Sequence, residues 1–209
     1  MKNKEITNFL EKLRGKNLIF FAPAASGKDW ILANFVSRYP SLVKSVVSTT
    51  TRPRRPSEVD GVAYHFTDND NFDKMVENGQ LLERTVYFVS GNKWQYGLTK
   101  DALCQNLINL IVVNPHGIRQ IMTHSDIMKN TYIFLVETPE DVRIERYLDR
   151  EKDCSDKSEL ASRLEQRLLQ DNKDFADLRD ISYLTLTNDK NTSFDDILEE
   201  IVSKIQRKD

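Results

Sequence analysis

The segment Leu18-Ile19-Phe20-Phe21-Ala22-Pro23-Ala24-Ala25-Ser26-Gly27-Lys28-Asp29 decides the fold class of this chain. An apolar run typical of a buried strand leads into a loop with the spacing of the pattern G-x-x-x-x-G-K-[ST]. In that pattern, backbone N–H groups, a helix N-terminus and a lysine surround nucleotide phosphates. Ala22 stands at the first glycine, and Asp29 stands at the Ser/Thr. By itself the loop is consistent with nucleotide binding and with an ordinary strand–loop–helix connection.

Asp29 determines what this loop needs in order to bind phosphates. A carboxylate is a good Mg²⁺ ligand, but its charge repels phosphates unless a metal ion lies between them. We therefore expect strict dependence on Mg²⁺, with Asp29 as the metal ligand.

A second candidate phosphate site follows the loop. Arg52 and Arg55 are three residues apart, so that a tight bend brings both guanidinium groups to one anion. Asp60-Gly61 predicts a turn into a strand over residues 62–66 whose alternate side chains share a face. Tyr64 on that face adds a hydroxyl to the same anion. A basic segment taken alone is more often a solvated surface.

The two motifs together resemble those of the guanylate kinase family. The family pattern R-x-x-R-x-x-E-x-[DN]-G-x-x-Y-x-F is matched at Arg52, Arg55, Glu58, Asp60, Gly61, Tyr64 and Phe66. The preceding Ser48-Thr49-Thr50-Thr51 resembles the family's S-x-T-T, and the resemblance continues to Asn188-Asp189. It implies an enzyme that moves the γ-phosphoryl group of ATP onto GMP or dGMP.

The resemblance also implies which residues bind GMP. Glu83 stands where the family places the carboxylate that recognises guanine. An ionised carboxylate accepts hydrogen bonds only, and guanine offers two adjacent donors, N1–H and the 2-amino group. The full set that the resemblance implies for GMP is Ser48, Arg52, Arg55, Tyr64, Glu83, Tyr96 and Asn114.

ATP is expected at the glycine–lysine loop and under a helical lid at about residues 143–167. The resemblance implies ATP binding by Ala25, Ser26, Gly27, Lys28, Asp29, Trp30 and Asn188. It implies catalysis by Lys28, Arg146, Arg150 and Arg163, since phosphoryl transfer depends on positioning and positive charge. The lid segment also carries Arg143 and Arg167. Charged helices with this spacing are often solvated faces, but the phosphate loop upstream favours a lid.

Three departures from the family pattern leave the acceptor open. Leu98 replaces a Ser/Thr, Val112 and Asn114 replace aspartates, and the segment from Glu83 to Tyr96 is longer than usual. One alternative is therefore a kinase for another nucleoside monophosphate or a phosphorylated sugar. A second is a catalytically silent binding module on the same scaffold, although a binding surface has no need of Gly27 and Lys28.

The order of patterns predicts an α/β fold, in which helices flank a parallel sheet. Strand patterns lie at residues 18–21, 43–48, 107–113, 132–137 and 183–187, with helical patterns between them and at residues 4–14 and 192–206. Residues 52–96, with a helix at 71–78, are expected to form a small mixed insert that binds GMP. Residues 1–51 and 97–209 are expected to form the P-loop core and the lid.

Composition sets the limits of these hypotheses. The chain has 209 residues, 39% of them hydrophobic, and a net charge of −2, so one sizeable core is expected and bulk nucleic-acid binding is not. No run predicts a membrane span or a signal core. The two cysteines, Cys104 and Cys154, lack ligand or redox spacing, and the three histidines lack metal spacing. We expect a cytoplasmic monomer or homodimer whose partners are ATP and GMP.

Overall fold

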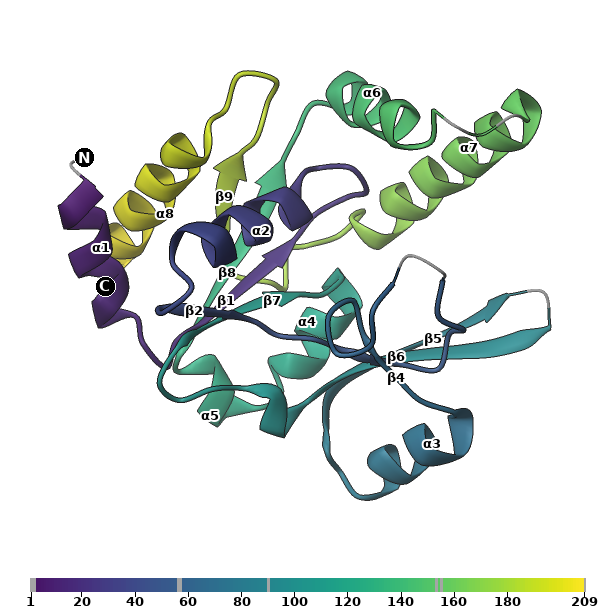
Figure 1. Ribbon diagram of the computed structural model, residues 1–209, viewed down its shortest axis with the longest axis horizontal. Coiled ribbons are helices and arrows are strands. Elements are labelled where there is room, and N and C mark those ends of the chain that lie inside the picture. The colour runs from purple at the N-terminus through teal and green to yellow at the C-terminus, as the bar shows by residue number, and fades with distance from the viewer. Residues whose placement is uncertain (1–2, 56–57, 90, 153, 155, 209) are drawn as a thin grey trace.

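Five parallel strands form the central sheet of the protein, for which a computed structural model describes residues 3–55, 58–89, 91–152, 154 and 156–208 (Figure 1). Their order across the sheet is β2-β7-β1-β8-β9. The bounds are β1 (Asn17–Phe21), β2 (Val43–Ser45), β7 (Ile108–Val112), β8 (Thr131–Glu137) and β9 (Leu184–Thr187). All neighbouring pairs run parallel, which confirms the fold class predicted from the sequence. The strand predicted at residues 43–48 ends earlier, at Ser45.

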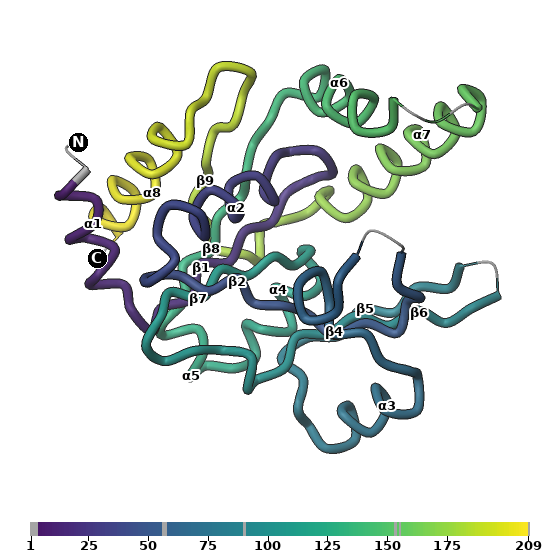
Figure 2. The backbone as a smooth tube through the Cα atoms, in the orientation of Figure 1, coloured from purple at the N-terminus to yellow at the C-terminus, as the bar shows by residue number. Residues whose placement is uncertain are grey.

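Helices cover both faces of this sheet, so every residue of β1 is buried. Leu18 and Phe20 pack with α1, α2 and α8 on one face, while Ile19 and Phe21 pack with α4 and α5 on the other. The helices are α1 (Asn3–Lys12), α2 (Lys28–Arg38), α4 (Pro115–Ile121), α5 (Ser125–Met128) and α8 (Phe194–Lys208). Figure 2 shows α1 and α8 side by side, at the end of the molecule where both termini lie.

A second, mixed sheet carries the segment predicted to bind GMP. Its order is β4-β3-β6-β5, with β3 (Thr49–Thr50), β4 (His65–Phe66), β5 (Leu81–Val89) and β6 (Asn92–Thr99), followed by the short helix η1 (Lys100–Ala102). Helix α3 (Asn69–Glu77) is capped by Asp68, whose carboxylate accepts from Asn71 N, and it buries Phe72 fully. A Cβ at Gly97 of β6 would lie 2.9 Å from Phe72 Cζ, so this glycine allows the helix to pack closely.

The strand predicted over residues 62–66 is wrong at its start, because only His65 and Phe66 form β4. Asp60 accepts a hydrogen bond from Phe66 N at 2.8 Å, and the chain between them closes into a turn. Val62 therefore lies outside the strand and is 72% exposed, although it lines the same cavity as Tyr64. The Tyr64 and Phe66 rings do meet, edge to face, with centroids 5.9 Å apart.

Two helices project from the central sheet where the lid was expected. They are α6 (Glu140–Arg150) and α7 (Lys157–Asp174), and in Figure 1 they extend toward the same side of the molecule as the β5–β6 hairpin. Asp156 caps α7 by accepting from the backbone N–H groups of Ser158 and Glu159. The first turn of α7 therefore begins at Lys157, while residues 153 and 155 lie outside the described part of the chain.

Candidate active site

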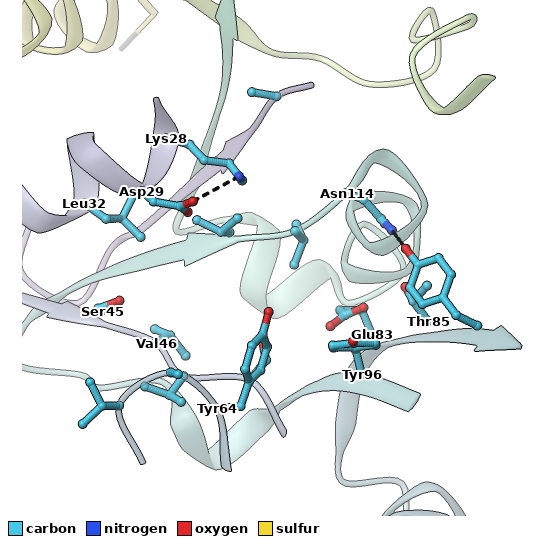
Figure 3. Close-up of a pocket in the computed structure, with 18 of the residues that line it drawn as sticks. Lys28, Asp29, Leu32, Ser45, Val46, Tyr64, Glu83, Thr85, Tyr96 and Asn114 are labelled. Carbon is cyan, nitrogen blue, oxygen red and sulfur yellow. Dashed lines mark hydrogen bonds and ion pairs between the residues drawn. The ribbon is translucent and has the colours of Figure 1, made fainter. Parts of the chain in front are cut away.

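A cavity of about 460 Å³ lies between the central sheet and the mixed sheet (Figure 3). In Figure 3, Lys28 and Asp29 stand on one side of it, and Tyr64, Glu83 and Tyr96 stand opposite. The polar side chains that line it are Lys28, Asp29, Ser45, Ser48, Tyr64, Glu83, Thr85, Tyr87, Tyr96, Asn114 and Arg167. Lys28 and Asp29 of the first motif and Tyr64 of the second therefore line one shared space.

The phosphate loop between β1 and α2 is fixed by residues far away in the sequence. Ser26 O accepts hydrogen bonds from Asn188 Nδ2 at 2.7 Å and from Thr138 Oγ1 at 3.1 Å. Gly27 has φ of 84°, and a Cβ there would lie 2.2 Å from Asn188 Nδ2. Ala25 also has a positive φ, of 60°. Glycine at position 27 thus provides both the left-handed backbone and the space that buried Asn188 occupies.

Lys28 and Asp29 begin α2 and face the cavity together. Their side chains are paired at 3.5 Å, and Asp29 is 81% exposed. The described residues hold no cluster of three or more His, Cys, Asp or Glu side chains that would form a metal site by themselves. Trp30 lies apart from the cavity lining, with its ring edge-on to Phe194 of α8 at 6.2 Å.

The arginines of the acceptor motif are held by Glu58. Arg52 is 7% exposed, and its Nη2 donates to Glu58 Oε1 at 2.6 Å. The other oxygen of Glu58 accepts from the backbone N of Arg55 at 2.8 Å. The Arg52 guanidinium also lies 5.6 Å from the centroid of the Tyr64 ring, which lines the cavity. Arg55 is exposed, and among the described residues neither arginine belongs to the cavity lining.

Glu83 is the one carboxylate at the acceptor end of the described lining, and it is 6% exposed. Burial raises its pKa to about 7, against hydrogen bonds from the Leu98 backbone and the Thr85 side chain that act in the other direction. A Cβ at Gly117 of α4 would lie 3.1 Å from Glu83 Oε2, so this glycine leaves space for the carboxylate. The Leu98 side chain is fully buried in the core and offers no contact to a base.

Asn114 is already engaged on both atoms of its amide. Oδ1 accepts from Gly117 N at 2.8 Å and caps α4, and Nδ2 donates to the Tyr87 hydroxyl at 3.4 Å. Tyr87 in turn meets Tyr96 edge to face, with ring centroids 5.7 Å apart. Asn114 therefore joins the central sheet to the β5–β6 hairpin at the wall of the cavity.

Thr85 and Tyr87 line the cavity but were not predicted from the sequence. The sequence could have predicted both residues from Glu83. Alternate residues of a strand share a face, and Glu83, Thr85 and Tyr87 alternate along β5. Thr138, whose hydroxyl donates to Ser26 O of the phosphate loop, could not be found in this way. It follows β8, and no residue predicted for the site lies on that strand.

The lid arginines occupy three different places. Arg146 donates to the carbonyl oxygens of Asn188 at 3.4 Å and Asp189 at 2.9 Å, beside the phosphate loop. Arg150 and Arg163 lie at the far end of the lid, where both pair with Glu151, at 3.4 and 3.6 Å. Arg167 alone among the arginines of the described lid lines the cavity.

A parallel sheet with a glycine–lysine loop after β1, a second, mixed sheet and two helices that project as a lid define the class of P-loop kinases. The guanylate kinase family model matches residues 14–207, so the chain belongs to the guanylate kinase family. It is thus an ATP-dependent nucleoside monophosphate kinase of that family, as the motifs predicted.

Individual relatives agree with this assignment. Guanylate kinase of Chlorobium luteolum is 32% identical over 196 residues, 91% of either chain. Guanylate kinase of Helicobacter hepaticus is 28% identical over 185 residues, 86% of either chain. The crystal structure of guanylate kinase from Anaplasma phagocytophilum superimposes with a TM-score of 0.60 at 18% identity, covering 95% of this chain and 88% of that one, and supports the fold.

None of the helices in the described ranges combines the length and apolar character of a membrane span.

Proposed function

We propose that this protein transfers the γ-phosphoryl group of ATP to GMP or dGMP, giving ADP and GDP or dGDP. The observation that carries the proposal is the shared cavity, with Lys28 and Asp29 on one wall and Tyr64, Glu83 and Tyr96 on the other. Two anionic substrates bound at these walls face each other, as in-line transfer requires. The cavity volume of about 460 Å³ suits small-molecule substrates.

On the donor side, we assign the phosphates of ATP to the loop 25–29. Its backbone N–H groups lie at the start of α2, where the helix dipole favours anions. Lys28 is assigned to the β and γ phosphates and Arg146 to the same end of the site. Asn188 lies against the loop, with its side chain fixed by Ser26 O.

Mg²⁺ fits this site as a cation bound jointly by protein and substrate. Mg²⁺ in nucleotide kinases is held by one or two carboxylates together with phosphate oxygens. Asp29 is exposed, faces the cavity and offers such a carboxylate. The ion supplies charge neutralisation for the phosphates when it is bound.

On the acceptor side, we assign guanine to Glu83 and the GMP phosphate to Arg52, Arg55, Tyr64 and Tyr96. The ionised form of Glu83 accepts from both guanine donors, whereas adenine presents the wrong pattern. Ser48 and Asn114 line the same cavity and are assigned supporting contacts.

A second candidate acceptor is another nucleoside monophosphate or a phosphorylated sugar. Two observations favour it. The Leu98 side chain is in the core, and both atoms of the Asn114 amide are engaged within the protein. Fewer free polar groups therefore surround the base than the family motif suggests.

A coupled assay of ADP release tests the proposal. The protein is supplied with Mg²⁺-ATP and, in turn, GMP, dGMP, AMP, CMP, UMP and phosphorylated sugars. We expect the highest kcat/KM with GMP or dGMP. A preference for a different acceptor supports the second candidate, and no ADP release with any acceptor supports a catalytically silent module. Cytoplasmic location and a monomeric or dimeric state remain predictions from the sequence.

A further inference from the structure

Asp171 of α7 is a buried carboxylate that joins three parts of the donor site. It is 3% exposed. Its Oδ2 accepts from the backbone N of Ala24 at 2.8 Å and pairs with Arg143 Nη1 of α6 at 3.3 Å. Its Oδ1 pairs with Arg167 Nε, one turn earlier on α7, at 3.4 Å. One side chain thus connects the phosphate loop to both lid helices.

The two arginines bound to Asp171 differ in how firmly they are held. Arg143 has a side chain 9% exposed, and it also reaches Ala24 O at 3.4 Å. Arg167 has a side chain 52% exposed, and Asp171 is its one ion-pair partner among the described residues. A buried carboxylate has to remain paired. Ala24 N and Arg143 keep Asp171 paired when Arg167 leaves, so Arg167 is the partner that can be released.

Arg167 also occupies the position that a transfer residue needs. It lines the cavity together with Lys28 of the phosphate loop and Tyr87 of the acceptor sheet. Burial raises the pKa of Tyr87, the hydrogen bond from Asn114 lowers it, and the charges of Asp174 and Arg167 act in opposite directions. Arg150 and Arg163, by contrast, are paired with Glu151 at the far end of the lid.

We propose that Arg167 is a further catalytic residue, which binds the phosphoryl group during transfer. Asp171 and Arg143 are the positioning residues that orient the Arg167 side chain toward the cavity. This inference rests on the proposed function. In the step, an oxygen of the acceptor phosphate forms a bond to the γ-phosphorus of ATP. The bond from that phosphorus to the β,γ-bridging oxygen breaks, and its electron pair stays on ADP. The acceptor oxygen is already deprotonated, so the planar guanidinium contributes charge and orientation and moves no proton.

The first test compares Arg167→Met with the wild-type enzyme in steady-state kinetics. Removing one preorganised charge from a transfer site lowers kcat by roughly 100-fold or more, with little change in the KM of either substrate. Arg167→Lys, which keeps charge without the planar fork, should retain an intermediate kcat. Lys173→Ala is the matched control, because Lys173 is an exposed cation on another face of α7, and its kcat should equal that of the wild type.

Thermal unfolding separates a catalytic role from a structural one. Arg167→Met leaves Asp171 paired with Arg143 and Ala24 N, so its Tm should stay near the wild-type value. Asp171→Asn removes the charge from the buried network, and both Tm and kcat should fall. If Arg167→Met has the kcat of the wild type, the role of Arg167 is overturned. The role is also overturned if kcat falls and Tm falls as far as it does in Asp171→Asn.

The outcome for the wild type distinguishes failure of this inference from failure of the proposed function. No ADP release with any acceptor refutes the proposed function before a variant is measured. If the wild type turns over GMP and Arg167→Met does so equally well, the proposed function stands and the role of Arg167 is refuted.

Discussion

The loop that carries Lys28 and the loop that carries Arg52 and Arg55 are both proposed to bind phosphate, but they are supported in different ways. The Lys28 loop is held by Asn188, Thr138 and Asp171, which follow it by more than 100 residues. The arginine loop is held from within, by Glu58 and Asp60, each six residues from its partner.

This difference suggests a division of labour between the two sides of the cavity. Contacts from the central sheet and the lid preorganise the donor side, which must place charge accurately at the transferred group. The acceptor loop is organised locally, and its Arg55 is exposed. Changes on the donor side should therefore lower kcat, whereas changes on the acceptor side should mainly affect GMP binding.

Lys28→Ala should show the largest loss of kcat among the variants proposed here. Loss of the ammonium group at the β and γ phosphates should lower kcat by about 1,000-fold, on the scale of charges that stabilise phosphoryl transfer. The dissociation constant of GMP, measured by calorimetry, should change little. Lys12→Ala, an exposed lysine at the end of α1, serves as the control. An equal loss of GMP binding would mean that the two sites are divided incorrectly.

Glu83→Ala tests the acceptor side next. Each charge-assisted hydrogen bond to guanine contributes about 1.5–3 kcal/mol, so kcat/KM for GMP should fall at least tenfold relative to AMP. The KM of ATP should be unchanged. Glu77→Gln, at the exposed end of α3, is the control for loss of a carboxylate from the same sheet region. Unchanged GMP kinetics in Glu83→Ala would rule out this residue as the guanine contact.

The raised pKa of Glu83 predicts a pH dependence of GMP binding. With a pKa of about 7, the carboxylate that accepts from guanine is mostly protonated at pH 6 and mostly ionised at pH 8. GMP affinity should therefore fall roughly tenfold between pH 8 and pH 6. Calorimetry in buffers of different ionisation enthalpy should show that GMP binding near pH 7 releases protons. Glu83→Gln should keep only the weaker dependence that comes from the GMP phosphate, whose second pKa is about 6, and a wild-type profile equal to that of the variant would contradict the prediction.

The same group predicts how stability changes with pH. Because the folded pKa of Glu83, about 7, lies above its ordinary value of 4.5, the folded state binds more protons between these two pH values. The free energy of unfolding should therefore fall as pH rises through this window, and Glu83→Gln should gain up to about 3 kcal/mol over the wild type above pH 7. Urea unfolding at pH 4 and pH 8 measures the gap, which should be near zero at the lower pH.

Glu58→Gln should have the smallest effect, confined to the acceptor loop. Glutamine has no charge and a single acceptor oxygen, so Arg52 loses its ion pair, and Arg52 Nη2 and Arg55 N no longer each have a carboxylate oxygen to bond. We expect the KM of GMP to rise roughly five- to tenfold with kcat nearly unchanged. A large loss of kcat would show that the acceptor loop also preorganises the transfer step.

The contrast between the loops also explains what the sequence could predict. The acceptor motif lies within 15 residues, Arg52 to Phe66, so its pattern already contains the contacts that Glu58 and Asp60 make. The fold followed from strand and helix patterns that are likewise local. The side chains that sequence reasoning missed, such as Thr138, Tyr87 and Asp171, act on segments far away in the chain, and only the fold brings them there.

Local reasoning failed at residues 62–66, where a side-chain hydrogen bond overrode the expected alternation of a strand. Residues 62–66 follow a turn signal and contain aromatic residues, which favoured a strand. Asp60 instead bonds to Phe66 N and closes the chain into a turn, leaving Val62 exposed. The predicted domain boundaries and the roles of the individual site residues stay predictions.

The central claim is that the two phosphate sites share one cavity, and a bisubstrate ligand tests it most directly. Adenosine and guanosine joined through a chain of phosphates should occupy both walls at once and bind much more tightly than either nucleotide alone, because the second contact becomes intramolecular. In inhibition kinetics this ligand should compete with both ATP and GMP. Competition with only one of the two, at an affinity no better than that of a single nucleotide, would contradict the account.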